Sequence, residues 1–147
     1  MTFDAMSKAQ PHPIGKLRRL DRQRRAVLFR AAITLTAASA VVALLPFRRA
    51  VRFGSVALGE GQIDIDDCTW AIEAAARRLP WRTLCIEQGL AAQRMLRRAG
   101  IDARLHYGAH RDTGSDKLHA HVWVSIAGRI ILGAEEAKAH AEIATFP

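Results

Sequence analysis

The hydrophobic period of this chain changes at Gly100. Before this glycine, apolar residues recur at spacings of three and four, which is typical of amphipathic helices. After it they recur at every second position, which is typical of strands with one buried face. The expected elements are helices over residues 64–79 and 83–99, followed by strands over residues 101–110, 118–126 and 129–132. Because helices and strands occupy separate parts of the chain, the sequence predicts an α+β fold with a small antiparallel sheet.

The net charge of +8 is concentrated in the first third of the chain. Residues 1–52 hold 11 Lys or Arg and 2 Asp or Glu, a balance of +9, whereas residues 53–147 hold 11 and 12, a balance of −1. A near-neutral domain lacks the basic face that nucleic-acid binding requires, so we expect no nucleic-acid partner. The two cysteines are too few for a disulfide scaffold or a closed zinc site.

This charge distribution divides the chain into a basic N-terminal region, residues 1–54, and a globular domain, residues 55–147. Residues 1–15 carry little periodic pattern and predict a loose tail. Residues 16–30 predict a basic helix, and the segment that follows, residues 31–47, contains no charged residue. The N-terminal region therefore predicts a tail followed by a basic and apolar helix.

The uncharged segment has three interpretations. A helix of its 17 residues would measure about 26 Å, at the lower limit of a membrane span. Ala38-Ser39-Ala40 resembles a signal-peptide cleavage site, although the basic region before it is long for a signal. The third interpretation, which we favour, is a helix that packs on the domain or lies at a membrane surface and ends at Pro46.

Cys85 lies near the start of the second predicted helix, for which Thr83 is the expected N-cap. A cysteine in the first helical turn is close to the positive end of the helix dipole, which favours the nucleophilic thiolate. The alternative is a small apolar residue in the buried face of the helix, because free cysteines are commonly buried. Cys68 falls in the apolar stripe of the preceding helix and is predicted to be a core residue.

His121 offers a proton acceptor for such a thiol. It lies on the second predicted strand beside Trp123, and a histidine there can face a helix N-terminus and activate a cysteine. If the Ala127-Gly128 hairpin has a loop of two or three residues, position 121 pairs with position 134 or 135. Glu135 is therefore the expected carboxylate that orients the imidazole, with Glu136 as the second candidate.

The sequence gives weaker reasons for a catalytic or binding role at the other histidines and at Trp81. His119 and His121 share one face of a strand, but two ligands without a second cluster do not make a zinc site, so no metal is expected. His106 and His110 share a face of the preceding strand and are interpreted as polar surface residues. Trp81 precedes Cys85 and either walls a substrate cleft or packs against the domain.

A cysteine at a helix N-terminus followed by a histidine on a later strand is the arrangement of papain-like and transglutaminase-like enzymes. The stretches RRLPWRTLCIEQGLAAQRMLRRAGIDARLHYGAHRD and LHAHVWVSIAGRIILGAEEA resemble the lasso peptide biosynthesis B protein. This family is a transglutaminase-like leader peptidase, also described as the microcin-processing protein C-terminal domain. Cys85 and Ala120-His121-Val122-Trp123-Val124 match its motif residue for residue. The resemblance covers residues 62–147, and the upstream ending LPFRR at residues 45–49 is also similar to the family.

The resemblance implies a bacterial, cytoplasmic cysteine peptidase that removes the leader from a ribosomally made lasso precursor. A separate ATP-dependent cyclase then closes the macrolactam. Residues 1–54 leave no room for a fused recognition domain, so a separate leader-recognition protein is expected as a partner. No cofactor is implied, and the ATP dependence of cleavage stays open.

The family's third catalytic residue is an aspartate downstream of the histidine. This sequence has no aspartate after Asp116. Glu135 is therefore the expected substitute in a triad with Cys85 and His121. A dyad in which a backbone carbonyl orients His121 is the alternative.

A function of a different class also fits the N-terminal region. The basic balance of residues 1–52 and the uncharged segment suit a non-catalytic adaptor that docks a precursor peptide or an exporter at the inner membrane. Such an adaptor needs neither Cys85 nor His121, so substitutions there discriminate between the two functions. The functions are also compatible, since a peptidase could contact the membrane peripherally through residues 16–52.

Overall fold

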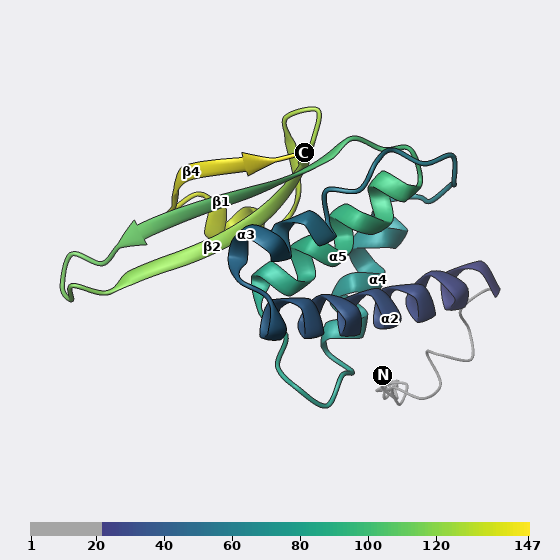
Figure 1. Ribbon diagram of the computed structural model, residues 1–147, viewed down its shortest axis with the longest axis horizontal. Coiled ribbons are helices and arrows are strands. Elements are labelled where there is room, and N and C mark those ends of the chain that lie inside the picture. Colours follow the sequence, from purple (N-terminus) through teal and green to yellow (C-terminus); the bar gives the residue numbers. More distant parts are fainter. Residues whose placement is uncertain (1–21) are drawn as a thin grey trace, which may run out of the picture.

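The computed structural model describes residues 22–147, in which helices pack against a four-stranded antiparallel sheet (Figure 1). The helices are α2 (Arg22–Leu44), α3 (Phe47–Ala50), a short 3-10 helix η1 (Val51–Phe53), α4 (Ile65–Ala76), α5 (Cys85–Arg98) and α6 (Ala134–Ala137). The strands are β1 (Ala103–Arg111), β2 (Leu118–Ile126), β3 (Arg129–Leu132) and β4 (Ala141–Phe146). This arrangement confirms the predicted α+β fold. The predicted tail, residues 1–15, lies outside the described residues.

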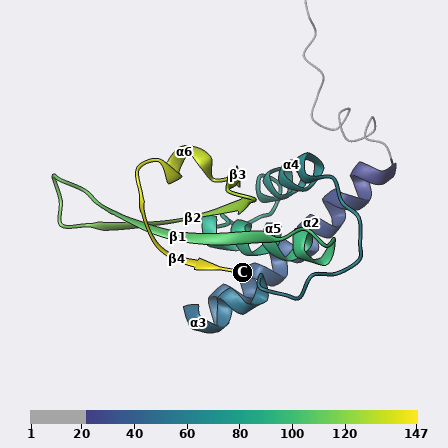
Figure 2. The ribbon, with the colours of Figure 1, turned by 90° about the horizontal axis from the view of Figure 1, so that it is seen from above.

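The sheet has the strand order β3-β2-β1-β4, and every neighbouring pair is antiparallel. β1 and β2 form a long hairpin, paired from Ala103 with Ile126 to Arg111 with Leu118, and its far end projects away from the helices (Figure 2). β3 pairs only with residues 124–126 of β2. The part of β2 that carries His121 therefore has no β3 residue beside it.

Two elements near the C-terminus differ from the predicted pattern. β4, whose sequence AEIATF indicated no definite element, pairs antiparallel with β1. The short helix α6 follows Gly133, which adopts a left-handed conformation with φ of 78°. This glycine turns the chain out of the strand, so β3 ends at Leu132 and does not continue opposite His121.

α2 is one continuous helix that contains the end of the predicted basic helix and most of the uncharged segment. Its inner face contributes Ala31, Leu35 and Ala38, all 0% exposed, to the core, where α2 packs against α4 and α5. Arg24 Nε also donates to Asp67 Oδ1 on α4 at 2.7 Å. α2 is thus a packed helix on this side, although it is also the one helix within residues 22–147 long and apolar enough to cross a membrane.

α5 approaches the sheet closely at Gly89, one helical turn after Cys85. A Cβ atom at this position would lie 2.8 Å from Leu105 Cδ1 on β1 and 2.8 Å from Val122 Cγ1 on β2. These distances are shorter than ordinary carbon contacts, so glycine allows α5 to lie at this depth. Because Val122 is adjacent to His121, the same contact sets how near the start of α5 comes to that histidine.

Replacement of Gly89 by valine is expected to destabilise the fold by about 1–3 kcal/mol through overpacking. Val122 is β-branched and stiff, so α5 must move away from the sheet. Thermal unfolding followed by circular dichroism measures the change. Gly114→Val is the matched control, because a Cβ atom there would meet nothing within 4 Å. Equal unfolding temperatures for Gly89→Val and the unsubstituted protein would contradict the close contact.

Candidate active site

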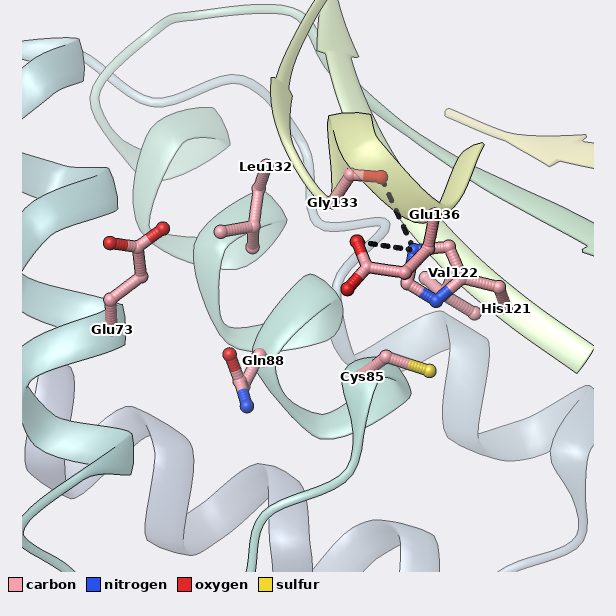
Figure 3. Close-up of a pocket in the computed structure, with 8 residues that line it drawn as sticks. All are labelled: Glu73, Cys85, Gln88, His121, Val122, Leu132, Gly133 and Glu136. Atoms are coloured by element: carbon pink, nitrogen blue, oxygen red, sulfur yellow. Dashed lines mark hydrogen bonds and ion pairs between the residues drawn. The ribbon is translucent and has the colours of Figure 1, made fainter. Parts of the chain in front are cut away.

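A cavity of about 240 Å³ lies where the start of α5 meets the open edge of β2 (Figure 3). Its lining residues are Glu73, Cys85, Gln88, His121, Val122, Leu132, Gly133 and Glu136. They come from α4, α5, β2, β3, the turn at Gly133 and α6. The structure therefore brings the two predicted reactive residues, Cys85 and His121, to one cavity.

Cys85 is the first residue of α5 and is partly exposed. The N-cap is Leu84 and not the predicted Thr83, because the Leu84 backbone N–H donates to the Glu87 carboxylate at 2.9 Å. An acid at the third helical position thus replaces the expected hydroxyl cap. The N–H groups of the first turn have no intrahelical acceptor, and together with the helix dipole they favour negative charge beside Cys85.

His121 reaches the cavity from β2, with 11% of its side chain exposed. Its Nε2 lies 3.2 Å from the carbonyl oxygen of Gly133. Since a carbonyl oxygen only accepts, Nε2 carries the proton and donates it to this bond. Nδ1 of the neutral ring is then free to accept a proton, and in Figure 3 it lies on the side of the ring that faces the Cys85 sulfur.

Within residues 22–147, no hydrogen bond joins the Cys85 thiol to the imidazole of His121. Catalytic hydrogen bonds often shorten only when a substrate is bound. The two side chains line one cavity, which is where such a contact would form.

The predicted acid, Glu135, does not lie beside His121. Its side chain is 85% exposed and accepts a hydrogen bond from Lys138 Nζ at 3.2 Å. The expected pairing of position 121 with 134 or 135 does not occur, because Gly133 ends β3 and α6 begins at Ala134. The second candidate, Glu136, lies nearer, with Oε2 3.9 Å from His121 Nε2. The Gly133 carbonyl is the closer partner of the ring, as the dyad alternative expects.

Gln88 and Glu73 also line the cavity, and neither was predicted as a site residue. Gln88 Nε2 donates to Thr83 Oγ1 at 3.0 Å, which holds the amide near Cys85. Gln88 follows Cys85 by three residues, so helical spacing could have placed both on one face. Glu73 comes from α4, and the sequence carried no signal for its approach.

Cys68 and Trp81 lie outside this cavity. Cys68 is 0% exposed, and its burial raises the pKa of the thiol to about 12, which confirms it as a core residue. Trp81 is partly exposed, and its Nε1 donates to Ser39 Oγ on α2 at 3.1 Å. Cys68 is therefore a buried cysteine with which the partly exposed Cys85 can be compared in the same chain.

The other predicted histidines also lie elsewhere. His106 Nε2 bonds Ser125 Oγ at 2.6 Å, and His106 lines a different cavity from that of Cys85. His110 packs edge-on against His140 with ring centres 5.9 Å apart, and His119 is exposed near the start of β2. Among the residues that the structure describes, no three His, Cys, Asp or Glu side chains are grouped to hold a metal ion.

A helix-borne cysteine and a strand-borne histidine that share a cavity are an arrangement found in enzymes with a cysteine nucleophile. The family model of the transglutaminase-like superfamily matches residues 17–145, and the chain belongs to this superfamily. No curated protein and no solved structure matches the chain. The superfamily match confirms the transglutaminase-like fold, which is that of cysteine peptidase-like enzymes.

Proposed function

We propose that this protein is a cysteine peptidase that removes the leader from a lasso peptide precursor before a separate cyclase closes the macrolactam. The observation that supports a peptidase is the placement of Cys85 and His121 on one cavity, with His121 Nε2 held by the Gly133 carbonyl. The sequence resemblance over residues 62–147 supplies the substrate class and the expected leader-recognition partner.

In the proposed reaction, Cys85 Sγ attacks the carbonyl carbon of the last leader residue, and His121 Nδ1 takes the thiol proton. N–H groups at the start of α5 stabilise the oxyanion of the tetrahedral intermediate. His121 gives its proton to the leaving nitrogen, which becomes the free amine of the core peptide. Water then attacks the thioester while His121 accepts a proton, and the leader carboxylate and the free thiol are released.

The direct test is incubation of the purified chain with a lasso precursor peptide and a leader-recognition protein, followed by mass spectrometry. The expected products are an intact leader and a core peptide with a free N-terminus. Cleavage should be slower when the recognition protein is left out. A precursor that stays intact with both the recognition protein and the cyclase present would contradict the proposed substrate class.

Glu136→Gln is expected to reduce cleavage less than about fivefold, because an exposed ion pair contributes roughly 0–1 kcal/mol. Its carboxylate is 64% exposed and lies beyond hydrogen-bond distance of His121 Nε2. Glu135→Gln is the matched control and should leave the rate unchanged, because that carboxylate contacts Lys138. Initial cleavage rates measure both. A loss of 100-fold or more in either variant would instead make that carboxylate the essential orienting group.

The exposed side of α2 supports a second candidate function, the membrane-associated adaptor without catalysis. An adaptor should still capture the precursor when Cys85 and His121 are both replaced by alanine. A peptidase with the same membrane contact would lose cleavage in that variant but keep its location. Measuring precursor binding and cleavage on one preparation separates the two functions.

A further inference from the structure

The side of α2 that faces away from the core carries an apolar strip, which we define as Ala26, Phe29, Ile33, Thr36, Ala40 and Leu44. These residues follow one another at spacings of three and four and so lie on one side of the helix. Phe29 is 68%, Ile33 55% and Leu44 80% exposed. The single hydroxyl group, on Thr36, donates to the Ala32 carbonyl at 2.8 Å and adds little polarity. A continuous exposed apolar strip of this kind marks a surface that binds a partner.

The charged residues of the segment that contains the α2 strip are all positive. Residues 22–52 contain seven arginines and no aspartate or glutamate. Three of them (Arg22, Arg25 and Arg30) lie toward the first half of the strip, and three (Arg48, Arg49 and Arg52) follow its end. An apolar strip bordered by arginines complements a surface that is apolar inside and anionic outside, which is the character of an anionic phospholipid membrane.

An arginine-lined cavity of about 180 Å³ lies beside the strip. Its lining residues are Arg30, Ile33, Thr34, Arg94, Met95 and Arg98, which include three guanidinium groups and no carboxylate. Arg94 is held in place by its bond to the Phe53 carbonyl at 2.8 Å. Guanidinium groups bind phosphate oxygens in bidentate fashion, so a phosphate would relieve the repulsion between like charges here.

Ile33 belongs both to the α2 strip and to the arginine-lined cavity. A lipid whose phosphate entered the cavity would therefore place its acyl chains along the strip. A phospholipid carries its phosphate and its hydrocarbon in one molecule, so a single ligand would fill the cavity and cover the strip together. This continuity favours a phospholipid as the occupant.

The opposite side of α2 determines how the helix can meet a membrane. Ala31, Leu35 and Ala38 are 0% exposed within the core, and Arg24 is bonded to Asp67 on α4. If α2 left the domain to span a bilayer, it would uncover this core and break that ion pair. α2 must therefore stay packed and lie in the plane of the surface, with only the strip inserted.

We infer that the α2 strip and the arginine-lined cavity dock the folded domain on an anionic phospholipid membrane, with α2 parallel to its surface. Trp81 strengthens the docking face, because it is 39% exposed and bonded to Ser39 on the flank of α2. Tryptophan is favoured at membrane interfaces, where its ring is apolar and its N–H is satisfied. Trp81 precedes Cys85 by four residues, so docking also holds the loop that leads to the cavity of Cys85 near the membrane.

The test is cosedimentation of the full chain with vesicles of phosphatidylcholine alone and of phosphatidylcholine mixed with phosphatidylglycerol. Binding is expected to the mixed vesicles and to weaken as salt is raised. Phe29→Gln with Ile33→Gln, and separately Arg30→Gln with Arg98→Gln, should each weaken binding by roughly 10- to 30-fold. All four side chains are outside the core, and an unchanged alkylation rate at Cys85 checks that each variant is folded.

The matched controls are two double substitutions on the sheet, one apolar and one of arginines, as in the α2 variants. Leu118 and Ile143 are 65% and 63% exposed, and their replacement by Gln should leave vesicle binding unchanged, as should Arg111→Gln with Arg129→Gln. Equal binding to both kinds of vesicle, or unchanged binding in both α2 variants, would overturn the inference. So would a dimer in light scattering that depends on Phe29 and Ile33 and forms without vesicle binding, because the strip would then be an interface between two copies.

Discussion

Replacement of Cys85 by alanine is expected to abolish precursor cleavage and to leave the fold unchanged. Removing the nucleophile of a hydrolase of this kind costs on the order of 10⁶-fold in turnover. Cys85 is partly exposed and packs only at the edge of the core, so alanine removes one sulfur atom there. The bond from the Leu84 backbone N–H to the Glu87 carboxylate, which caps α5, does not involve the Cys85 side chain. Cleavage measured by mass spectrometry, with circular dichroism as the check of folding, gives the result.

Cys68→Ala is the matched control for this substitution. Its thiol is buried in the core at 0% exposure and away from the cavity, so cleavage should persist while the unfolding temperature falls. Both variants remove one sulfur atom from the chain. If Cys85→Ala still cleaves the precursor, or if Cys68→Ala is the variant that stops cleavage, the assignment of the nucleophile is wrong.

Replacement of His121 by alanine has the second largest expected effect, a loss of roughly 10²- to 10⁴-fold in cleavage rate. The ring supplies the proton acceptor for the thiol and the proton donor for the leaving amine. Its Nε2 bond to the Gly133 carbonyl directs Nδ1 to the cavity, and His121 is the one imidazole among the residues that line this cavity. The measurement is the initial cleavage rate at saturating precursor.

His119→Ala is the control for His121→Ala. It lies two residues earlier on β2, carries the same imidazole and is exposed outside the cavity. Its loss should change the rate less than twofold, as for a surface substitution. Comparable losses in both variants would indicate a general effect on β2 and not an acid–base role for His121.

The strands β2 and β3 could be predicted with their observed bounds, because alternation and a two-residue turn are local features of the sequence. The stripe of α5 likewise predicted its position to within two residues. β4 and α6 could not be predicted, since β4 is defined by its pairing with β1 and α6 by the left-handed turn at Gly133. The position of β4 depends on long-range pairing, and that of α6 on the backbone conformation of one glycine.

The residues of the candidate site likewise separate into those that local sequence patterns predict and those that they do not. Cys85 and His121 could be identified because a helix start and a strand are local patterns, and the family resemblance joins them. The orienting partner could not, because the choice among Glu135, Glu136 and the Gly133 carbonyl depends on where β3 ends. The exposed apolar strip of α2 could not be predicted either. The uncharged segment is nearly uniform in sequence, and only packing distinguishes its two sides.

The most direct test of the central claim, that Cys85 and His121 are a coupled nucleophile and base, is the rate of iodoacetamide alkylation at each cysteine between pH 5 and 10. The thiolate is the reactive form, so the rate reports its population. In the folded protein Cys85 should be alkylated at pH 7 about tenfold faster than in His121→Ala. Cys68 should stay unmodified until the chain is unfolded, because burial raises the pKa of its thiol to about 12. Identical pH profiles for Cys85 with and without the imidazole would contradict the account.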